Sequence, residues 1–355
     1  MVSYSLSKLT IDKNSIAYNY AHINDFLYNG ASVACVVKAN AYGLGAIDVG
    51  RILYDAGCRD FFVATLQEGI LLRRTIGFAP EIYVLCGVFH NTEDLYIEYS
   101  LTPTINNTEE MLTWNKNYAK YRCILKIDTG MSRNGLSIID VMSNEKTIRE
   151  LNIVYAVSHL ACADDPNNEK NIEQLNRFMI VKSTLGGDIR YSLSATNGVF
   201  LGKQYHFDMV RVGSGLYNFV SDKYGFRDVV GLYARILQIK NISKGSTVGY
   251  DAVFIADNDM MLAVIGIGYA DGLMKLSVDK YTAYVGDYEC PFVGEISMDY
   301  SIIDVTHVPR GILHLEDFVS IFGHRTSIKS LADKIGTNCG HITSTLGMRV
   351  ERVYY

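Results

Sequence analysis

The chain has 355 residues, 48% of them hydrophobic, and a formal net charge of -5 at pH 7. This length allows a large hydrophobic core and predicts one barrel-sized domain plus a smaller one. The mildly acidic charge and the lack of a block of basic residues argue against nucleic acid or an anionic membrane surface as a partner.

Apolar runs and cysteines bear on location and redox state. The longest apolar run, around residues 260–269, is too short to span a bilayer, and the N-terminus lacks a signal-peptide pattern. We therefore expect a cytoplasmic protein with no membrane segment in this chain, which also fits the cytoplasmic domain of a longer, membrane-anchored protein. The seven cysteines are odd in number, scattered and without a Cys-x-x-Cys pair, which predicts reduced thiols, no disulfide frame and no metal site.

The first two-thirds of the chain alternates short apolar runs with amphipathic stretches. A short strand over residues 6–11 precedes a helix that begins at Asn14. Because parallel strands need crossover helices, the alternation that follows predicts a (β/α)8 TIM-like barrel with its chemistry at the carboxyl ends of the strands. The eight expected strands cover residues 31–38, 61–65, 81–86, 101–105, 123–127, 153–160, 191–194 and 209–212.

The pattern changes near Val230. From there to about Phe322 the sequence shows short strands with turn signals and no long helical pattern. One helix over residues 327–335 and a last strand over residues 349–355 complete the chain. We therefore expect a barrel domain over residues 1–230 and a β-rich C-terminal domain over residues 231–355, with no flexible linker between them.

The most informative stretch is Val36 to Gly45, which reads Val-Val-Lys-Ala-Asn-Ala-Tyr-Gly-Leu-Gly. It places Lys38 where a buried strand ends and a glycine-bearing loop begins. An amine at the carboxyl end of a parallel strand is partly shielded from water, which lowers its pKa and frees it to bond to an aldehyde. The alternative is a strand-end lysine that extends its amine into solvent, and these ten residues alone leave both open.

This stretch resembles the segment of alanine racemases in which a lysine carries pyridoxal phosphate. The resemblance implies that Lys38 binds the cofactor and that Tyr42 is a phenol donor beside it. Further motifs in the same order extend the resemblance over essentially the whole chain. It implies an amino-acid substrate and a homodimer with shared active sites.

After the fifth barrel strand, Leu-Lys-Ile-Asp-Thr-Gly-Met-Ser-Arg-Asn-Gly is similar to the family's Lys-x-Asp-Thr-Gly-Met-x-Arg-Leu-Gly. The resemblance implies that Arg133 holds the substrate carboxylate or the phenolic oxygen of the cofactor, a role suited to a permanently charged fork of donors. A surface arginine in a loop is the alternative. In many relatives the lysine that matches Lys126 is carbamylated and positions this arginine, so Lys126 is a candidate for that modification.

The sixth strand ends in Val-Ser-His-Leu-Ala-Cys-Ala-Asp-Asp, close to the family's Thr-His-Phe-Ala-x-Ala-Asp. The resemblance implies that His159 orients other groups and is not the base; a core histidine bonded to backbone is the alternative. Strand seven leads into Ser194-Ala195-Thr196, which resembles the family's Asn-Ser-Ala segment with Leu193 in place of the asparagine. Ser194 is then the hydroxyl expected to bind the cofactor phosphate.

Strand eight gives Val-Arg-Val-Gly-Ser-Gly-Leu-Tyr, similar to the family's Val-Arg-Pro-Gly-Ile-x-Leu-Tyr-Gly. The amides of Gly213 and Ser214 would bind the phosphate, as loops after strands seven and eight often do. In the family, the arginine that matches Arg211 faces the pyridine nitrogen and, being always protonated, keeps that nitrogen from accepting a proton. The weaker electron sink favours racemisation over transamination.

The C-terminal domain supplies the remaining motifs. The segment ending in Tyr250 resembles the one that carries the family's catalytic tyrosine, which reaches the active site of the other subunit. Tyr269 would line the entrance, and the Met298 amide would meet the substrate carboxylate. Because racemisation needs a base on each face of a planar carbon, Lys38 and Tyr250 are the pair that we expect to act.

Three departures from the family pattern stand out. Where relatives read Gly-Thr-x-x-Tyr-Glu-Ile, this chain reads Gly-Thr-Asn-Cys-Gly-His-Ile, so Gly340 replaces a tyrosine beside the substrate. The missing ring leaves room for a hydroxyl, to which Asn338 offers a hydrogen bond; alternatively, Asn338 caps the turn after the preceding helix. Glu295 replaces a usual arginine and Asn134 a usual leucine, and the sequence explains neither.

These motifs predict an isomerase: a pyridoxal-phosphate-dependent racemase that interconverts L- and D-serine, and L- and D-alanine, for cell-wall precursors. The departure at Gly340 resembles the racemase domain of the membrane-anchored serine racemases of vancomycin-resistance clusters. A biosynthetic alanine racemase is the alternative. A non-catalytic pyridoxal-phosphate carrier is disfavoured because such proteins lack the second domain, and a related decarboxylase because its cysteine and glycine-run motifs are not evident.

Overall fold

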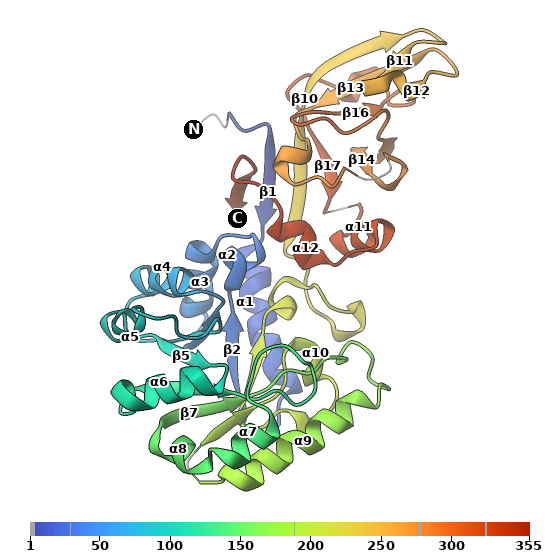
Figure 1. The fold of residues 1–355 in the computed structure, drawn as a ribbon. Helices are drawn as coiled ribbons and strands as arrows, with labels where there is room; N and C mark the ends of the chain where they lie inside the picture. The colour runs from blue at the N-terminus through green and yellow to red at the C-terminus, as the bar shows by residue number, and fades with distance from the viewer. Residues whose placement is uncertain (1–3, 29, 188, 276–277, 324) are drawn as a thin grey trace. The chain divides into compact units, whose positions relative to one another are not determined.

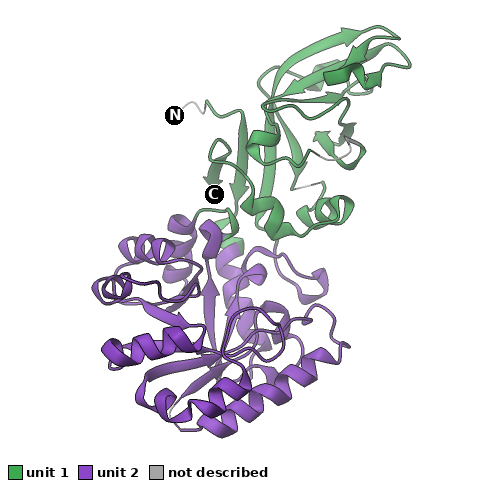
Figure 2. Cartoon of the chain, in the orientation of Figure 1, with its two compact units in different colours: residues 1–15, 42–45, 228–355 green, residues 16–41, 46–227 purple. Residues whose placement is uncertain are grey.

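The computed structural model describes residues 4–28, 30–187, 189–275, 278–323 and 325–355. The chain forms two compact units, shown in different colours in Figure 2. The barrel unit consists of residues 16–41 and 46–227, and the β-rich unit consists of residues 1–15, 42–45 and 228–355. The break between Arg227 and Asp228 lies close to the expected boundary, but the first fifteen residues belong with the C-terminal part of the chain.

The barrel unit is an eight-stranded sheet in which each strand pairs in parallel with its neighbours (Figure 1). The strand order is β8-β7-β6-β5-β4-β3-β2-β9, and a bridge between Ala195 and Arg211 brings the two ends together. The expected TIM-like barrel is therefore confirmed, with all eight strands present. They are β2 Ser32–Val36, β3 Asp60–Val63, β4 Glu81–Val84, β5 Thr102–Ile105, β6 Arg122–Lys126, β7 Asn152–Val157, β8 Arg190–Ser192 and β9 Met209–Val212.

Local capping residues set where several barrel helices begin. Thr65 accepts a hydrogen bond from the Glu68 amide at 3.3 Å, and the Glu68 carboxylate accepts one from the Thr65 amide, which starts α4 directly after β3. Ser137 starts α7 with the same reciprocal pair of bonds, and Asn107 caps α6 by accepting from the Glu110 amide. The helices are α1 Lys13–His22, α3 Ala46–Asp55, α4 Leu66–Ile76, α5 Glu93–Glu98, α6 Thr108–Tyr118, α7 Ile138–Ser143, α8 Glu145–Glu150, α9 Lys170–Leu185 and α10 Thr196–Val199.

The main sheet of the β-rich unit is mixed, with the strand order β15-β14-β17-β10-β1-β18. Strand β13 pairs with β10, and β16 pairs with β13. The N-terminal strand β1 pairs antiparallel with β10 and parallel with β18. This pairing is why the strand expected at residues 6–11 belongs here and not in the barrel. The strands are β1 Ser7–Ile11, β10 Val230–Ile242, β11 Thr247–Val248, β12 Phe254–Ile255, β13 Met260–Ile265, β14 Thr282–Val285, β15 Tyr288–Pro291, β16 Ser301–Asp304, β17 Phe318–Phe322 and β18 Glu351–Tyr354.

Two helices complete the β-rich unit. Helix α11, Ile328–Ile335, begins after its N-cap Ser327 and confirms the helix expected at residues 327–335. Helix α12, Cys339–Ser344, was not expected, because its six residues are mostly weak helix formers. Across the described part of the chain, no helix has both the length and the apolar character needed to cross a membrane.

Candidate active site

Lys38 opens a turn of left-handed backbone directly after β2. Residues 39–41 have φ angles between 51 and 54°, although none of them is glycine. Two side-chain bonds tie this turn to its surroundings: Asn40 of the turn accepts a hydrogen bond from the Ala46 amide at 2.8 Å, and Glu68 accepts one from the Ala39 amide at 2.7 Å. The backbone after Lys38 is thus fixed by specific contacts.

The environment of Lys38 favours its uncharged amine. Burial is the main cause that lowers the pKa of Lys38, and the positive charge of Arg133 lowers it further. The carboxylate of Glu68 opposes these effects, and Arg211 adds to them. A lowered pKa is what nucleophilic attack on an aldehyde requires of a lysine.

Arg211 on β9 is a buried cation, with only 5% of its surface exposed. Its Nη1 donates to the Ser192 carbonyl at 2.9 Å, and its Nη2 donates to the carbonyls of Ser158 and Leu193. Burial lowers the pKa of Arg211 to about 10, which leaves it protonated at neutral pH. The carbonyls at the ends of β7 and β8 therefore hold a permanent positive charge in one orientation.

His159 lies next to that cation, with its Nδ1 3.5 Å from Arg211 Nη2. Burial, followed by the charge of Arg211, lowers the pKa of His159 to about 2. The imidazole is therefore neutral, and its Nδ1 faces the guanidinium as an acceptor. A neutral ring beside a fixed cation suits an orienting role and not that of a base.

Lys126 ends β6 on the same side of the barrel. Burial lowers the pKa of Lys126 well below its ordinary value, the charges of Arg211 and Arg133 lower it further, and Asp128 opposes them. These effects favour the uncharged amine, which is the form that reacts with carbon dioxide to give a carbamate.

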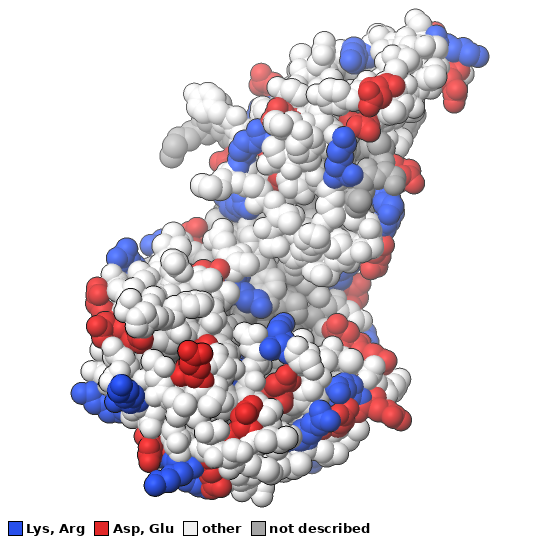
Figure 3. All heavy atoms as spheres, in the orientation of Figure 1, with Lys and Arg blue, Asp and Glu red and all other residues white. Residues whose placement is uncertain are grey.

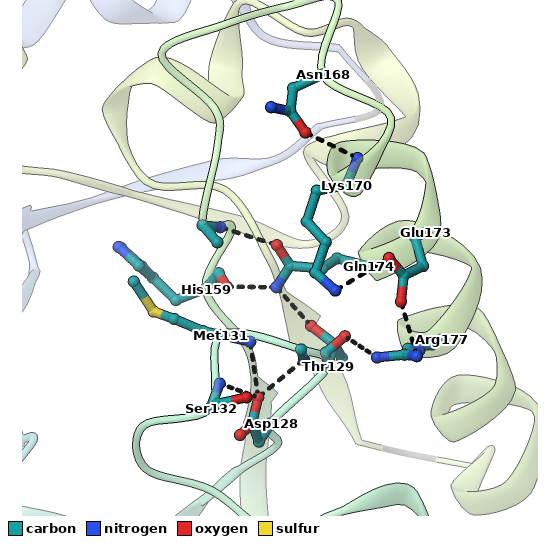
Figure 4. Close-up of polar contacts among 12 residues, drawn as sticks. Asp128, Thr129, Met131, Ser132, His159, Asn168, Lys170, Glu173, Gln174 and Arg177 are labelled. Carbon is teal, nitrogen blue, oxygen red and sulfur yellow. Dashed lines mark hydrogen bonds and ion pairs between the residues drawn. The ribbon is translucent and has the colours of Figure 1, made fainter.

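Asp128 shapes the loop that carries Arg133. Its Oδ1 accepts backbone hydrogen bonds from Gly130 at 2.8 Å, Met131 at 2.9 Å and Ser132 at 3.1 Å (Figure 4). Burial on its own would raise the pKa of Asp128, but these amides outweigh it and lower the pKa. The loop is therefore built around a carboxylate, and the exposed Arg133 side chain extends from it.

Gln174 on α9 links two of the strand ends, as Figure 4 shows. Its Nε2 donates to Thr129 Oγ1 at 3.1 Å and to the His159 carbonyl at 2.9 Å, while its Oε1 accepts from the Ala161 amide at 2.8 Å. Thr129 in turn lies 2.8 Å from Ser158 Oγ. This buried amide fixes the loops after β6 and β7 together, and the sequence analysis did not single it out.

The turn after β9 differs in detail from what the sequence suggested. The Ser194 hydroxyl is buried and donates to the Tyr205 carbonyl at 2.8 Å, so its proton points away from the turn. Instead, Thr196 Oγ1 accepts from the Gly213 amide at 3.2 Å and from the Gly215 amide at 3.3 Å. Because Thr196 Oγ1 accepts both bonds, its own hydroxyl hydrogen can be donated to another group. The Gly213 amide already donates to Thr196.

In the β-rich unit, Tyr250 begins the 3₁₀ turn Tyr250–Ala252 that follows β11, and 64% of its surface is exposed. The preceding Gly249 has φ of 81°, and a Cβ there would lie 3.1 Å from the Glu295 amide nitrogen. The Glu295 carboxylate pairs with Lys275 Nζ at 2.9 Å. Glu295 is therefore part of an ion pair beside the segment that presents Tyr250.

Tyr269 and Met298 lie on two loops that pack closely together. The Tyr269 amide donates to the Ser297 carbonyl and the Ala270 amide to the Met298 carbonyl, both at 3.0 Å. Arg349 links the two loops, because it forms ion pairs with Asp271 at 3.0 Å and with Asp299 at 2.7 Å. The side chains of Tyr269 and Met298 are 41% and 51% exposed.

Asn338 is the N-cap of α12, with its Oδ1 accepting the His341 amide at 2.8 Å. It therefore caps the following helix and not the end of α11, where Gly336 is the cap. Two residues later, a Cβ on Gly340 would lie 3.3 Å from the ring of Tyr42. Tyr42 therefore packs closely against Gly340.

The site holds no metal centre that the structure reveals: among the described residues, no three His, Cys, Asp or Glu side chains are grouped to hold an ion. On the visible face of each unit, acidic and basic side chains are interspersed, without a large area of one sign (Figure 3). In the barrel unit, charged and titratable groups that act on one another's pKa values are Lys38, Lys126, Arg133, His159 and Arg211.

Comparison with known proteins covers both units. Residues 11–219 match the family model described as alanine racemase, N-terminal domain, and residues 229–354 match the one described as alanine racemase, C-terminal domain. The chain belongs to the alanine racemase family.

Similar proteins match along nearly their whole length. The alanine racemase of Brucella ovis is 36% identical over 98% of this chain and 93% of its own, and that of Rickettsia bellii is 37% identical over 91% of this chain and 81% of its own. The solved structure of alanine racemase from Bartonella henselae, which has covalently bound pyridoxal phosphate, superposes with a TM-score of 0.92 at 32% identity, covering 99% of this chain and 100% of that one.

Alanine racemases depend on pyridoxal phosphate, and the donor set of the barrel unit fits that group. Lys38 offers an amine of lowered pKa, Arg211 a buried cation and Thr196 a hydroxyl with a free proton. The sequence analysis did not single out Thr196 or Glu68. Both stood in recognisable patterns, Thr196 within the motif quoted for Ser194 and Glu68 as the fourth residue of a Thr-x-x-Glu capping box.

Proposed function

We propose that this chain is a pyridoxal-phosphate-dependent racemase that interconverts L- and D-alanine. The observation that carries the proposal is the arrangement of Lys38, His159 and Arg211, in which an amine of lowered pKa shares the carboxyl end of the barrel with a neutral imidazole and a fixed guanidinium. The names of the most similar relatives support alanine as the substrate.

Each residue has a distinct task. Lys38 Nζ binds the cofactor and moves the α-proton on one face of the substrate, and the Tyr250 hydroxyl moves it on the other. When bound, pyridoxal phosphate delocalises the negative charge that remains once the proton has left. Arg211 keeps its proton and so does not protonate the ring nitrogen of the cofactor. Arg133 holds the substrate carboxylate, and Thr196 donates a hydrogen bond to the cofactor phosphate.

The two bases lie in different units of the chain, and we propose that the working enzyme is a homodimer in which Tyr250 and Met298 of one subunit complete the site of the other. Their exposure supports this, because 64% of Tyr250 and 51% of Met298 remain uncovered in the single chain. A carbamate on Lys126 would supply a negative charge next to Arg133 and hold it in place.

Serine is a second candidate substrate, and Gly340 is the observation that favours it. The position that carries tyrosine in relatives has no side chain here, and we propose that the missing ring leaves room for a substrate hydroxyl, although a Cβ at Gly340 would already lie 3.3 Å from the ring of Tyr42. Against this, Asn338 already uses its Oδ1 as a helix cap. The resemblance to serine racemases of resistance clusters rests on this position alone, so we place alanine first.

The purified protein should show the visible absorbance of lysine-bound pyridoxal phosphate and should form the D-enantiomer from L-alanine faster than from L-serine. Lys38→Ala should lose the absorbance and at least about 10³-fold of the activity, because it removes both the attachment point and a base. Its thermal unfolding should stay near wild type. Retained racemisation by this variant would overturn the assignment, and a higher kcat/KM for L-serine would reverse the order of the substrates.

A further inference from the structure

The left-handed turn after Lys38 is energetically costly and must be held by its surroundings. For L-residues this conformation costs roughly 1–2 kcal/mol each, and residues 39–41 adopt it in succession, with φ angles of 51, 54 and 53°. None of the three is glycine, so none of them avoids the steric cost of this conformation by lacking a side chain. Without external bonds the turn would relax and the lysine before it would lose its direction.

The strongest external bond comes from Glu68 at the start of α4. Its Oε1 accepts from the Ala39 amide at 2.7 Å, the first N–H after Lys38. Its Oε2 accepts from the amides of Ala64 at 2.7 Å and Thr65 at 3.3 Å. One carboxylate therefore joins the turn after β2 to the loop after β3.

The same carboxylate also counters the positive charge around the Lys38 amine. The charges of Arg133 and Arg211 lower the pKa of Lys38, and Glu68 opposes them. Lys126 and His159 also interact electrostatically with Lys38. The nearby carboxylate of Asp128 acts on Lys126 and is engaged by the backbone of its own loop.

We propose that Glu68 is a positioning residue for Lys38: it holds the left-handed turn that aims the lysine and supplies the negative charge that balances the surrounding cations. This proposal rests on the proposed function of Lys38. The proposal adds to the site a helix-capping residue, Glu68, which bonds to the backbone after Lys38 through the Ala39 amide.

Glu110 offers a matched control within the same barrel. It occupies the equivalent third position of α6, and its carboxylate accepts from the Asn106 amide at 2.9 Å and from the side-chain amide of Asn107 at 2.8 Å. Its carboxylate bonds to the loop after β5 and not to the turn after Lys38. Glu68 and Glu110 variants therefore share the loss of a carboxylate that bonds to backbone amides ahead of a helix, whereas an effect on Lys38 is specific to Glu68.

The first test is hydrogen exchange of the protein without added cofactor, followed on the peptide that spans residues 37–45. Glu68→Ala should speed exchange in this peptide about tenfold or more, since the Ala39 amide loses its acceptor. Glu110→Ala should leave this peptide unchanged. Equal exchange in wild type and Glu68→Ala would overturn the anchoring role.

The second test uses the loaded enzyme and Glu68→Gln, which keeps an acceptor oxygen but removes the charge. Losing a carboxylate destabilises protonated Lys38, so its pKa falls, and the ascending limb of the kcat–pH profile should move to lower pH by about half a unit or more. Glu110→Gln should not move it. An unshifted limb in Glu68→Gln would refute the charge role, whereas missing cofactor absorbance in the wild type would count against the function of Lys38 itself.

Discussion

The two units present their chemical groups in opposite ways. In the barrel unit, Arg211 is 5% exposed and bonded to three carbonyls, and the partly buried His159 lies against it. In the β-rich unit, Tyr250 and Met298 lie on turns and are mostly exposed. The barrel therefore fixes charge before a ligand arrives, while the β-rich unit offers side chains that need another surface to complete them. The contrast fits a site whose two bases come from different subunits.

The largest expected effect comes from removing the exposed base. Tyr250→Phe deletes one hydroxyl on the surface of its unit, so stability should be unchanged while racemisation falls by about 10²- to 10⁴-fold. Exchange of the α-proton with solvent, followed by NMR, should collapse for one enantiomer and persist for the other. Equal losses for both enantiomers would contradict the two-base scheme.

Sharing between subunits can be tested with the same variant. A mixture of Lys38→Ala and Tyr250→Phe chains, unfolded and refolded together, should regain activity, because one of the two sites in a mixed dimer has both bases. Each variant refolded alone is the control. No recovery on mixing would show that the exposed tyrosine serves its own chain.

A buried residue should behave differently from Tyr250 because it affects both stability and rate. Arg211→Lys keeps the charge but loses the planar fork that reaches the carbonyls of Ser192, Ser158 and Leu193. We expect a loss of about 2 kcal/mol in the free energy of unfolding and a fall in kcat of about tenfold or more. Denaturant unfolding and steady-state kinetics measure the two. Wild-type stability would mean that the buried bonds contribute little.

The buried histidine gives the barrel unit a pH dependence. The folded-state pKa of His159 is about 2, below the value near 6.5 of an unfolded histidine, so the unfolded chain binds the extra proton first. Its contribution to stability is present above pH ~6.5 and is lost as the pH falls, by about 1.4 kcal/mol per unit. Between pH 6 and 5, wild type should therefore lose more stability than His159→Asn in denaturant unfolding. Parallel curves would contradict a buried neutral ring.

The smallest effect is expected at Asn338. As an N-cap, Asn338→Ala should cost about 1 kcal/mol of stability and should change the ratio of kcat/KM for L-serine over L-alanine by less than about threefold. A tenfold fall in that ratio, equivalent to about 1.4 kcal/mol, would instead place Asn338 on the substrate hydroxyl and bring serine forward. Ser327→Ala, which removes the N-cap of α11, is the matched control.

The sequence determined most of the barrel and the positions that carry its chemistry. All eight strands were predictable because buried parallel strands are continuous apolar runs, and each such run ends where a polar side chain follows. Lys38, Arg133, His159 and Arg211 were identified from motifs at those ends. The roles of these residues came from the resemblance to alanine racemases and stay predictions, whereas their places at the strand ends follow from short-range signals.

Tertiary structure decided the contacts between segments far apart in the chain. The N-terminal strand β1 joined the β-rich unit because β10 and β18 pair with it. Thr196, and not Ser194, accepts hydrogen bonds from the amides of Gly213 and Gly215 because the turn after β9 folds back onto it. Glu68 became part of the site through its bond to Ala39, 29 residues earlier. Local pattern fixes a strand and its end, but only folding shows which distant backbone amide a side chain will meet.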